Sequence, residues 1–438
     1  MVGWPSPPQQ PENPENPENP ETPGNPEKRD EPSSSIVGIW NYLRTLDESH
    51  DDDVMVIVNG DNAWMQLRPA TLVDRFFDIN RRANTRLRER MPKVLRHHDL
   101  KQQIIFGVQK ECPEALRGDP GCYAAPASEL LPHAYGPDTD TKGRNEEDRL
   151  IHLRPRFLDA GLITGTVRAL RTLFSQAIIL RAMGEDMQQT MNRLFGLQLG
   201  YREMLRRGVG MKANPVLKAE DIKLMRSYVD KRPNGTFEFS IGLDYGSELG
   251  MNTAWAGKES DTIYFDNPSS LQNARDTRGI SVFTGGLQIA WNIANSLPPF
   301  WTFSREPKLP RWTHWDQIPL LINLWTTNVP AIVHHSPSTD DESVTKRSGF
   351  DKAWFREHER TLLDAQIYAP MLPVAVAGEN SSMIREFWSM ELWRGGARDA
   401  NFKQSSLDGW VRLDEACFDY HEQLFTDGEG PWVLPENH

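Results

Sequence analysis

Residues 54–67 read Val-Met-Val-Ile-Val-Asn-Gly-Asp-Asn-Ala-Trp-Met-Gln-Leu, and this stretch decides the fold. Its first five residues are apolar and mostly β-branched, a run too short for a helix and typical of a buried strand. The next four residues, 59–62, favour turns and carry oxygen atoms that can bind a ligand. In open α/β sheets, ligands bind beyond the carboxyl ends of the strands. The stretch therefore predicts a strand that leads into a binding site, although an ordinary strand–turn–helix corner has the same pattern.

Composition restricts the class of protein and its partners. The 438 residues carry a formal net charge of −12, which argues against nucleic acid or an anionic membrane as the main partner. Mean hydropathy is −0.58, and no apolar run approaches the roughly 18 residues that a membrane span needs. No signal peptide follows Met1, so we expect a cytoplasmic location for the chain as written. Cys112 and Cys122 flank a short loop and could form a disulfide in an oxidising compartment.

The chain divides into three parts. Residues 1–35 are rich in Pro, Glu, Asn and Ser and repeat the triplet Pro-Glu-Asn. The segment contains too few apolar residues to offset the loss of conformational entropy on folding, and we therefore predict that it is disordered. Residues 36–350 carry the alternating apolar segments of one α/β domain. We assign residues 351–438 to a helical and loop extension packed on the same domain.

Apolar periodicity predicts the elements of this domain. Runs with a spacing near 3.6 residues predict helices at residues 36–46, 70–91, 166–182 and 186–206. Short apolar runs predict further strands at residues 103–108, 154–165, 237–245 and 329–335. Strands that alternate with helices over this length favour a mostly parallel sheet covered by helices on both faces.

Three of the predicted strands carry side chains that could meet a ligand. Asp244 ends one strand, and His334 and His335 end another. Asp159 and Gly161 lie in a third, where small residues often mark the close approach of a ligand or another backbone. Two structural alternatives stay open, because His334 could be a core histidine and Asp244 could cap the next turn.

Six motifs occur in a characteristic order. They are the opening stretch, QIIFGVQKECPE (103–114), RPRFLDAGLITG (154–165), FSIGLDYGSEL (239–249), VPAIVHH (329–335) and DEACFDYHEQLFTDGEGPW (414–432). Together they resemble a family of fungal proteins with a GT-A type glycosyltransferase fold, which is related to the glycosyltransferase domain of procollagen lysyl hydroxylases. The resemblance extends over most of residues 36–432.

The resemblance implies a GT-A-like sheet that binds a nucleotide-sugar donor through a divalent metal ion, Mn²⁺ or Mg²⁺. In the family, two aspartates after the first motif's strand and one later histidine bind the metal. The matching positions are Asn59, Asn62 and His334. Both aspartates are asparagines here, which removes two negative charges from the site. Asp61 is the acid that remains in the turn, and we expect it to compensate as a metal ligand.

Other motif positions supply the remaining candidates. The family's Asp-Gln motif near the donor sugar falls on Met187-Gln188, with Asp186 displaced by one position, so Asp186 and Gln188 are the catalytic candidates. The acceptor-side Asn-Ser-Gly corresponds to residues 159–161. The substrate-binding candidates are Trp64, Asp159, Gly161 and Asp244. For Trp64, a place in the core is the structural alternative.

The resemblance also concerns the N-terminus. Relatives carry a first strand, a nucleotide-binding loop and a Golgi membrane anchor before a Val-Gly-Trp that stands here at residues 2–4. We therefore expect this chain to lack that strand, that loop and the anchor.

Two hypotheses for the function follow. The chain is a glycosyltransferase with a nucleotide-sugar donor and an unidentified acceptor, or it is a catalytically degenerate GT-A-like protein that acts as a binding or partner subunit. The lost acids favour the second hypothesis chemically.

Overall fold

The computed structural model describes most of the chain after residue 33. The described ranges are 34–58, 63–141, 150–181, 186–231, 237–281, 287–305, 308–335, 350–367, 369–370, 372–378, 384–388, 396–398, 410–425 and 427–433. The predicted disordered segment lies outside them, except for its last two residues, which begin helix α1 (Ser34–Thr45). The turn at residues 59–62 also lies outside the described residues.

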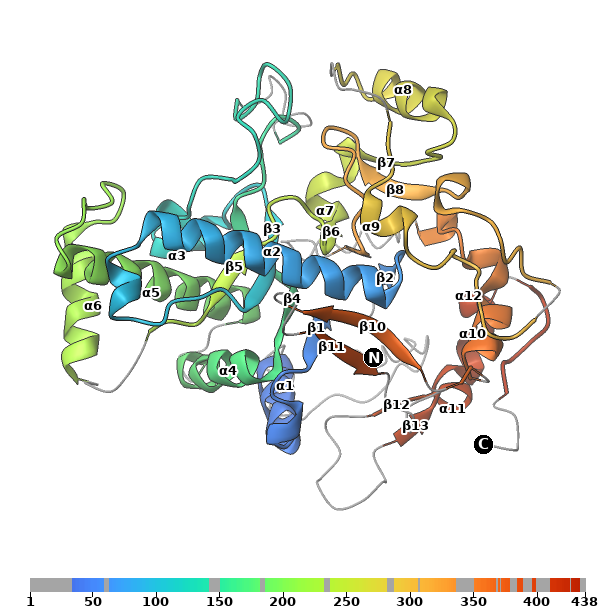
Figure 1. The fold of residues 1–438 in the computed structure, drawn as a ribbon, viewed down its shortest axis with the longest axis horizontal. Coiled ribbons are helices and arrows are strands. Elements are labelled where there is room, and N and C mark those ends of the chain that lie inside the picture. The colour runs from blue at the N-terminus through green and yellow to red at the C-terminus, as the bar shows by residue number, and fades with distance from the viewer. Residues whose placement is uncertain are drawn as a thin grey trace, which may run out of the picture.

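The central sheet has four strands in the order β1-β4-β3-β5 (Figure 1). These strands are β1 (Val54–Val58), β4 (Phe157–Thr166), β3 (Ile104–Gln109) and β5 (Ile241–Leu243). β4 runs antiparallel to both of its neighbours, and β3 runs parallel to β5. Each predicted strand is present, although the 237–245 segment forms only the short β5.

The predicted mostly parallel sheet is wrong for the described residues, in which β3–β5 and β6–β9 are the parallel pairs. The reason lies in the connection between β3 and β4. The chain leaves β3 at Gln109 and re-enters the sheet opposite it, at Phe157. A strand that enters at the end where its neighbour ended must run antiparallel to it. The architecture is therefore mixed α/β.

A second sheet adjoins the first and has the order β2-β9-β6. It contains β2 (Ala63–Met65), β9 (Ile332–His334) and β6 (Gly250–Asn252). β2 pairs antiparallel with β9, and β6 pairs parallel with β9. A separate antiparallel pair, β7 (Ser260–Ile263) and β8 (Leu320–Asn323), follows β6 in the chain. The short helix α7 (Thr253–Ala256) lies between β6 and β7.

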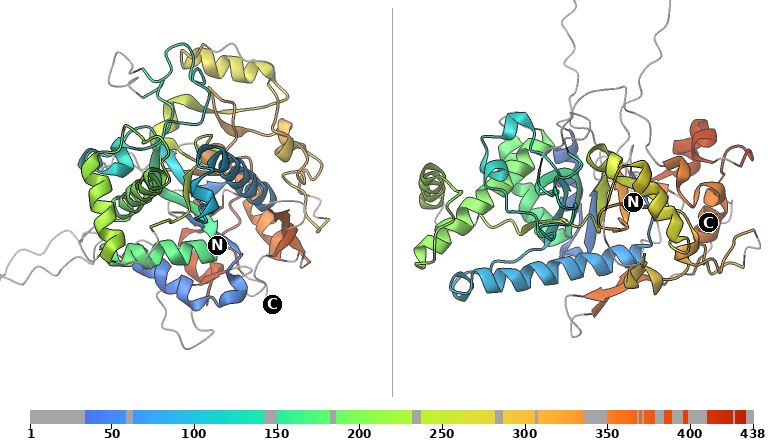
Figure 2. Two further views of the ribbon diagram at one scale, coloured as in Figure 1. Left: turned by 60° about the vertical axis from the view of Figure 1, so that its left-hand side comes forward. Right: turned by 90° about the horizontal axis from the view of Figure 1, so that it is seen from above.

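The central sheet is covered on both faces, as predicted. Alternate residues of β1 belong to different clusters: Met55 and Ile57 pack in the cluster of α1, α4 (Val167–Arg181) and α5 (Met187–Gly208), while Val56 packs in the cluster of α2 (Pro69–Arg90). This alternation follows from the two-residue period of a strand. Figures 1 and 2 show α2 running across one side of the strands.

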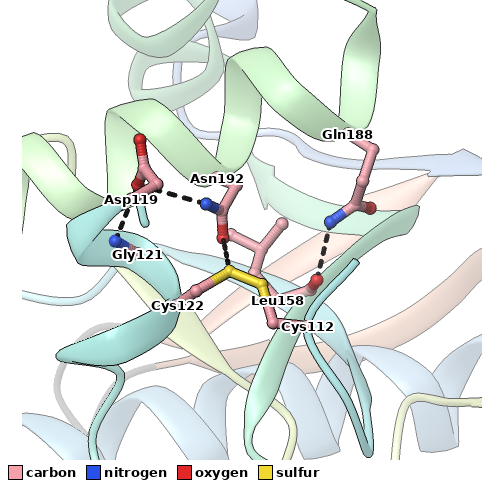
Figure 3. The surroundings of a disulfide bond; sticks show 7 residues. All are labelled: Cys112, Asp119, Gly121, Cys122, Leu158, Gln188 and Asn192. Carbon is pink, nitrogen blue, oxygen red and sulfur yellow. Dashed lines mark hydrogen bonds between the residues drawn. A yellow bond between two sulfur atoms is a disulfide. The ribbon is translucent and has the colours of Figure 1, made fainter. Parts of the chain in front are cut away.

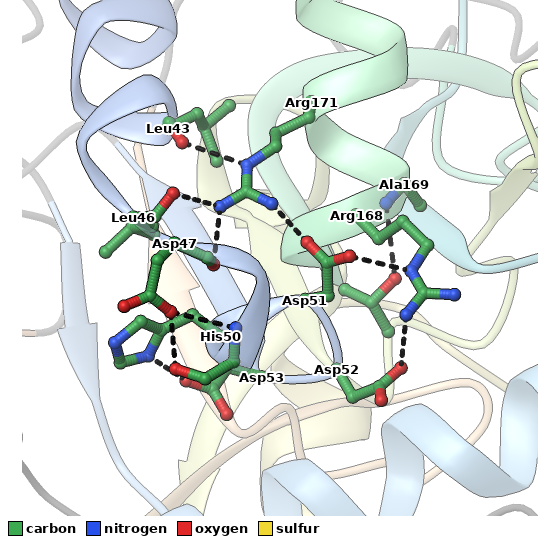
Figure 4. A network of polar contacts seen from close by, with 12 residues as sticks. Leu43, Leu46, Asp47, His50, Asp51, Asp52, Asp53, Arg168, Ala169 and Arg171 are labelled. Atoms are coloured by element: carbon green, nitrogen blue, oxygen red, sulfur yellow. Dashed lines mark hydrogen bonds and ion pairs between the residues drawn. The ribbon is translucent and has the colours of Figure 1, made fainter.

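The acidic residues before β1 connect it to the helices. Arg171 of α4 donates hydrogen bonds to the carbonyl oxygens of Leu43 (3.0 Å) and Asp47 (2.9 Å), and it pairs with Asp51 (Figure 4). Arg168 also contacts Asp51, at 3.1 Å. The acceptors lie at the end of α1 and in the turn before β1. Arg171 therefore fixes the approach of the chain to the central strand.

The remaining elements surround these two sheets. They are α3 (Pro120–Tyr123), α6 (Ala219–Lys231), α8 (Pro268–Thr277), α9 (Trp291–Ala294), α10 (Glu359–Ile367), β10 (Pro373–Gly378), β11 (Ile384–Trp388), β12 (Gly396–Arg398), β13 (Trp410–Arg412), α11 (Leu413–Cys417) and α12 (His421–Leu424). The region after residue 350 was predicted as helices and loops, but it also contains the hairpins β10–β11 and β12–β13. Phe387 of β11 contacts Phe77 of α2, which packs the hairpin on the main body. Among the described helices, none combines the length and apolar character that a membrane span requires.

Candidate functional site

The candidate site lies where the two sheets meet, on either side of the opening motif's turn. Val58, the last residue before the turn, pairs with Leu162 of β4. Ala63, the first described residue after it, pairs with His334 of β9. The metal candidates Asn59, Asp61 and Asn62 lie between these two points and outside the described residues. The two described flanks of the motif therefore lie beside β4 and the end of β9.

His334 is buried at the end of β9, with 1% of its surface exposed. β6 lies beside it, with Asn252 opposite in the register. Burial lowers the pKa of His334; the carboxylate of Asp159 opposes this shift, and His335 adds to it. The imidazole is therefore neutral near pH 7, which is the form that binds a metal ion. Asn252 pairs with His334 in the register and donates to Asp159, so these two candidates lie in one site.

Asp159 connects the two sheets. One carboxylate oxygen accepts a hydrogen bond from the backbone N–H of Gly161 at 2.9 Å, and the other accepts from Nδ2 of Asn252 at 2.7 Å. The pairing of β3 with β4 shifts beside it, because Phe106 pairs with Ile163 but Gly107 pairs with Asp159. Such a bulge bends a strand and redirects its side chains. Gly161 thus contributes to the site through its backbone, inside the bulge.

Gln188 holds this bulge in place from helix α5. Its Nε2 donates to the carbonyl oxygen of Leu158 at 2.8 Å, and its Oε1 accepts from the backbone N–H of Ala160 at 2.8 Å. Figure 3 shows the side chain pointing from α5 to β4. Asp186 is the N-cap of the same helix and forms a capping box with Gln189. The contacts of both catalytic candidates are therefore structural, and Gln188 positions the strand that carries Asp159.

Asp244 is buried, and its contacts are those of the structural alternative. Its carboxylate accepts hydrogen bonds from the backbone N–H groups of Glu248 (2.9 Å), Leu249 (2.7 Å) and Gly250 (3.1 Å). Burial raises its pKa to about 6; the charge of Glu248 adds to the shift, and these hydrogen bonds oppose it. Asp244 therefore caps the turn that joins β5 to β6 and so places Asn252.

Trp64 also matches its structural alternative. It lies in β2 with 7% of its surface exposed, and its ring meets that of Phe350 edge to face at 5.6 Å between centroids. It pairs with Val333, one residue before His334. Trp64 therefore supports the strand beside the site from within the core.

Two residues of the site, Asn252 and Thr253, were not identified from the sequence as site residues. Asn252 binds Asp159 through its amide nitrogen, while its Oδ1 accepts from the N–H of Ala254 at 3.0 Å as the N-cap of α7. Thr253 Oγ1 lies 3.0 Å from Nδ1 of His335. Nε2 of His335 is buried and has no hydrogen-bond partner in the described part of the chain. An Asn before a short helix normally indicates only a cap, so the sequence carried no specific signal for Asn252.

The described residues supply part of a metal site. Asp159 offers a carboxylate and His334 a neutral imidazole, both suited to a divalent cation. Within the ranges that the structure describes, no group of three or more His, Cys, Asp or Glu side chains could hold a metal ion. Mn²⁺ and Mg²⁺ take about six ligands. A metal bound here would therefore need further ligands, for which Asp61 is the sequence candidate.

Comparison of the chain with protein-family models and with curated proteins gives no match. The functional assignment therefore depends on the geometry of this site and on the motif resemblance. The geometry consists of two sheets joined by Asp159 and Asn252, with His334 opposite the residue that follows the polar turn.

Proposed function

We propose that the chain is a GT-A-like glycosyltransferase that binds a nucleotide-sugar donor with a divalent metal ion where its two sheets meet. The observation that carries the proposal is the pairing of Ala63 with His334. This pairing brings the strand that follows the polar turn beside the histidine to which the resemblance assigns metal binding. Burial lowers the pKa of His334, so its ring is uncharged at neutral pH, which is the form that binds a cation.

The chain's own residues have distinct roles in this proposal. When bound, the metal ion would neutralise charge on the donor's diphosphate and so stabilise it as a leaving group. His334, with Asp61 from the turn, would hold it. Asp159 is fixed by Gly161 and Asn252 but keeps a free acceptor position on each carboxylate oxygen, because each oxygen has two lone pairs. Asp159 can therefore orient an acceptor hydroxyl group.

The second candidate function is a GT-A-like binding or partner protein without catalysis. Asn59 and Asn62 favour it, because amides replace the two carboxylates of the family motif. Amide oxygens can coordinate a cation but do not attract it by charge. The two candidates differ in turnover rather than in fold, so ligand binding and sugar transfer must be measured separately.

Thermal unfolding with uridine diphosphate and Mn²⁺ tests donor binding. A ligand at 100 times its Kd stabilises the folded state by about 2.7 kcal/mol. We expect stabilisation that requires both ligands and disappears in Asp61→Asn and His334→Gln. Asp78→Asn, on the exposed side of α2, is the matched control and should leave it unchanged. No stabilisation of the wild-type chain at millimolar ligand would refute the donor site.

Turnover separates the two candidates. If the donor binds, release of uridine diphosphate from a panel of uridine-diphosphate sugars, with and without candidate acceptors, measures hydrolysis and transfer. Metal-dependent release that is lost in Asp159→Asn supports the transferase. Tight binding with no release in any combination supports the binding protein instead.

A further inference from the structure

Away from the candidate site, a pocket of about 510 Å³ opens at the end of β3 and the start of β4. Its lining contains four basic residues, Lys110, Arg117, Arg154 and Arg156, and two acidic ones, Glu111 and Asp140. Cys112 and Cys122, which form a disulfide (Figure 3), are among its lining residues. A basic pocket is notable in a chain with a net charge of −12. Its volume is within the range of about 300–1,000 Å³ that is usual for small-molecule sites.

Three of the four basic residues already have partners within the fold, and one of them, Arg117, pairs with Glu114 at 3.4 Å on the surface. Lys110 is buried and pairs with Glu259, and it donates to the carbonyl oxygen of Leu150 at 2.7 Å. Arg154 binds Asp140, with Nε 3.1 Å from one carboxylate oxygen and 3.2 Å from the other. These pairs balance their own charges. Lys110 and Arg154 therefore have a structural role in the pocket lining, and their charges contribute little to the attraction of a ligand.

Arg156 is different. It is half-buried, and in the described part of the chain it forms no ion pair with a carboxylate. One terminal nitrogen donates to the carbonyl oxygen of Ala125, and the guanidinium carbon lies 5.2 Å from the ring centre of Phe157. Its Nε is buried and has no hydrogen-bond partner among the described residues. The charge of Arg156 contributes to lowering the pKa of Asp140, but the main cause is the hydrogen bond from Arg154, which occupies that carboxylate.

A half-buried guanidinium that lines a pocket and has no carboxylate partner in the described part of the chain is stabilised by an anion bound beside it. Its planar fork matches a carboxylate or phosphate group through two parallel hydrogen bonds. The contacts with Ala125 and Phe157 fix the group in advance, so little side-chain entropy remains to be lost on binding. Phe157 and Leu153 provide an apolar surface beside it for the body of a small molecule.

We propose that this pocket binds a small organic oxyanion, a carboxylate or phosphate ester, with Arg156 as its anchoring residue. Arg117 lies at the exposed rim, where its pair with Glu114 and the nearby charge of Glu111 reduce the attraction it adds. The proposal does not depend on the glycosyltransferase assignment, because it involves neither the metal candidates nor the turn at residues 59–62.

Isothermal titration calorimetry of the full chain in metal-free buffer tests this site. The probes are inorganic phosphate, glucose 6-phosphate and citrate, each at low and high salt. We expect saturable binding that weakens with salt and that Arg156→Gln reduces by about tenfold or more. Arg156→Lys should bind between these limits, because it keeps the charge but not the fork. Tighter binding of the phosphates than of citrate identifies a phosphate ester, and the reverse order a carboxylic acid.

Arg81→Gln is the matched control, because Arg81 is exposed on α2 and does not line the pocket. Its affinity should equal that of the wild type. Glu111→Gln should tighten binding, since it removes a negative charge from the lining. Unfolding midpoints of all variants identify any loss of folding. The proposal fails if the wild type shows no saturable binding at millimolar anion, or if both Arg156 variants bind as the wild type does.

Discussion

The disulfide between Cys112 and Cys122 gives a quantitative prediction. It joins residues ten positions apart, with a Cα–Cα distance of 5.8 Å that is usual for such bonds. In the chain-entropy model, closing a loop of this length costs the unfolded state an entropy equivalent to about 3 kcal/mol at room temperature. We therefore expect reduction with dithiothreitol to lower the free energy of unfolding by about 3 kcal/mol, measured by urea denaturation.

Variants separate this effect from packing. Cys122 has 2% of its surface exposed, so Cys112→Ser with Cys122→Ala removes the bond and also some buried sulfur. This double variant should be less stable than the oxidised wild type by about 3 kcal/mol or slightly more, and dithiothreitol should not change it further. The entropic reasoning is refuted if reduction leaves the stability of the wild type unchanged, or if it destabilises the double variant equally.

Three further predictions concern buried and half-buried contacts. Gln188→Ala should lower the free energy of unfolding by about 1–3 kcal/mol and weaken donor binding, because it leaves the Leu158 carbonyl and the Ala160 N–H without their partner. The same loss of donor binding in Gln189→Ala, which alters only the helix cap, would contradict this role. Lys110→Met should lower the free energy of unfolding in urea by about 3–5 kcal/mol, because it leaves Glu259 buried without its cation. The double variant Lys110→Met with Glu259→Gln should recover much of this stability, and equal stability of the single and double variants would show that the charge is not the cause. Burial raises the pKa of Asp244 from 3.8 to about 6, so its contribution to stability is present below about pH 4 and is lost, by about 3 kcal/mol, as the pH rises through 6. The difference in unfolding free energy between the wild type and Asp244→Asn should change by this amount between pH 4 and 6, and a constant difference would contradict the shifted pKa.

Local patterns were sufficient to predict most elements of the fold. Pro69 begins α2, and the spacing of Leu72, Phe76 and Ile79 places one face of that helix in the core, as the periodicity indicated. Strand direction was different. It depends on where the chain re-enters a sheet, and the pairing of Gln109 with Phe157 reverses β4 relative to the expectation. The hairpin β10–β11 was missed although β10 has an apolar run as long as that of β1, because its partner β11 lacks such a run and is mostly exposed.

The candidate site was predictable only in part, for a related reason. His334 and Asp159 occupy strand positions, so motif order alone was enough to propose that they share a site. The role of Gln188 depends on a three-dimensional contact. A glutamine that faces a sugar and one that holds a bulge have the same local sequence. The bulge itself arises from a shift in pairing that no local pattern specifies.

Strand β4 connects the two proposed binding sites. Phe157 lines the basic pocket, and Asp159 bridges the two sheets. Because residues two apart on a strand point to the same face, about 7 Å separates these positions on one surface. Gln188 forms hydrogen bonds with the backbone of Leu158 and Ala160, on either side of Asp159. The same half-buried glutamine therefore sets the position of Asp159 relative to both sites.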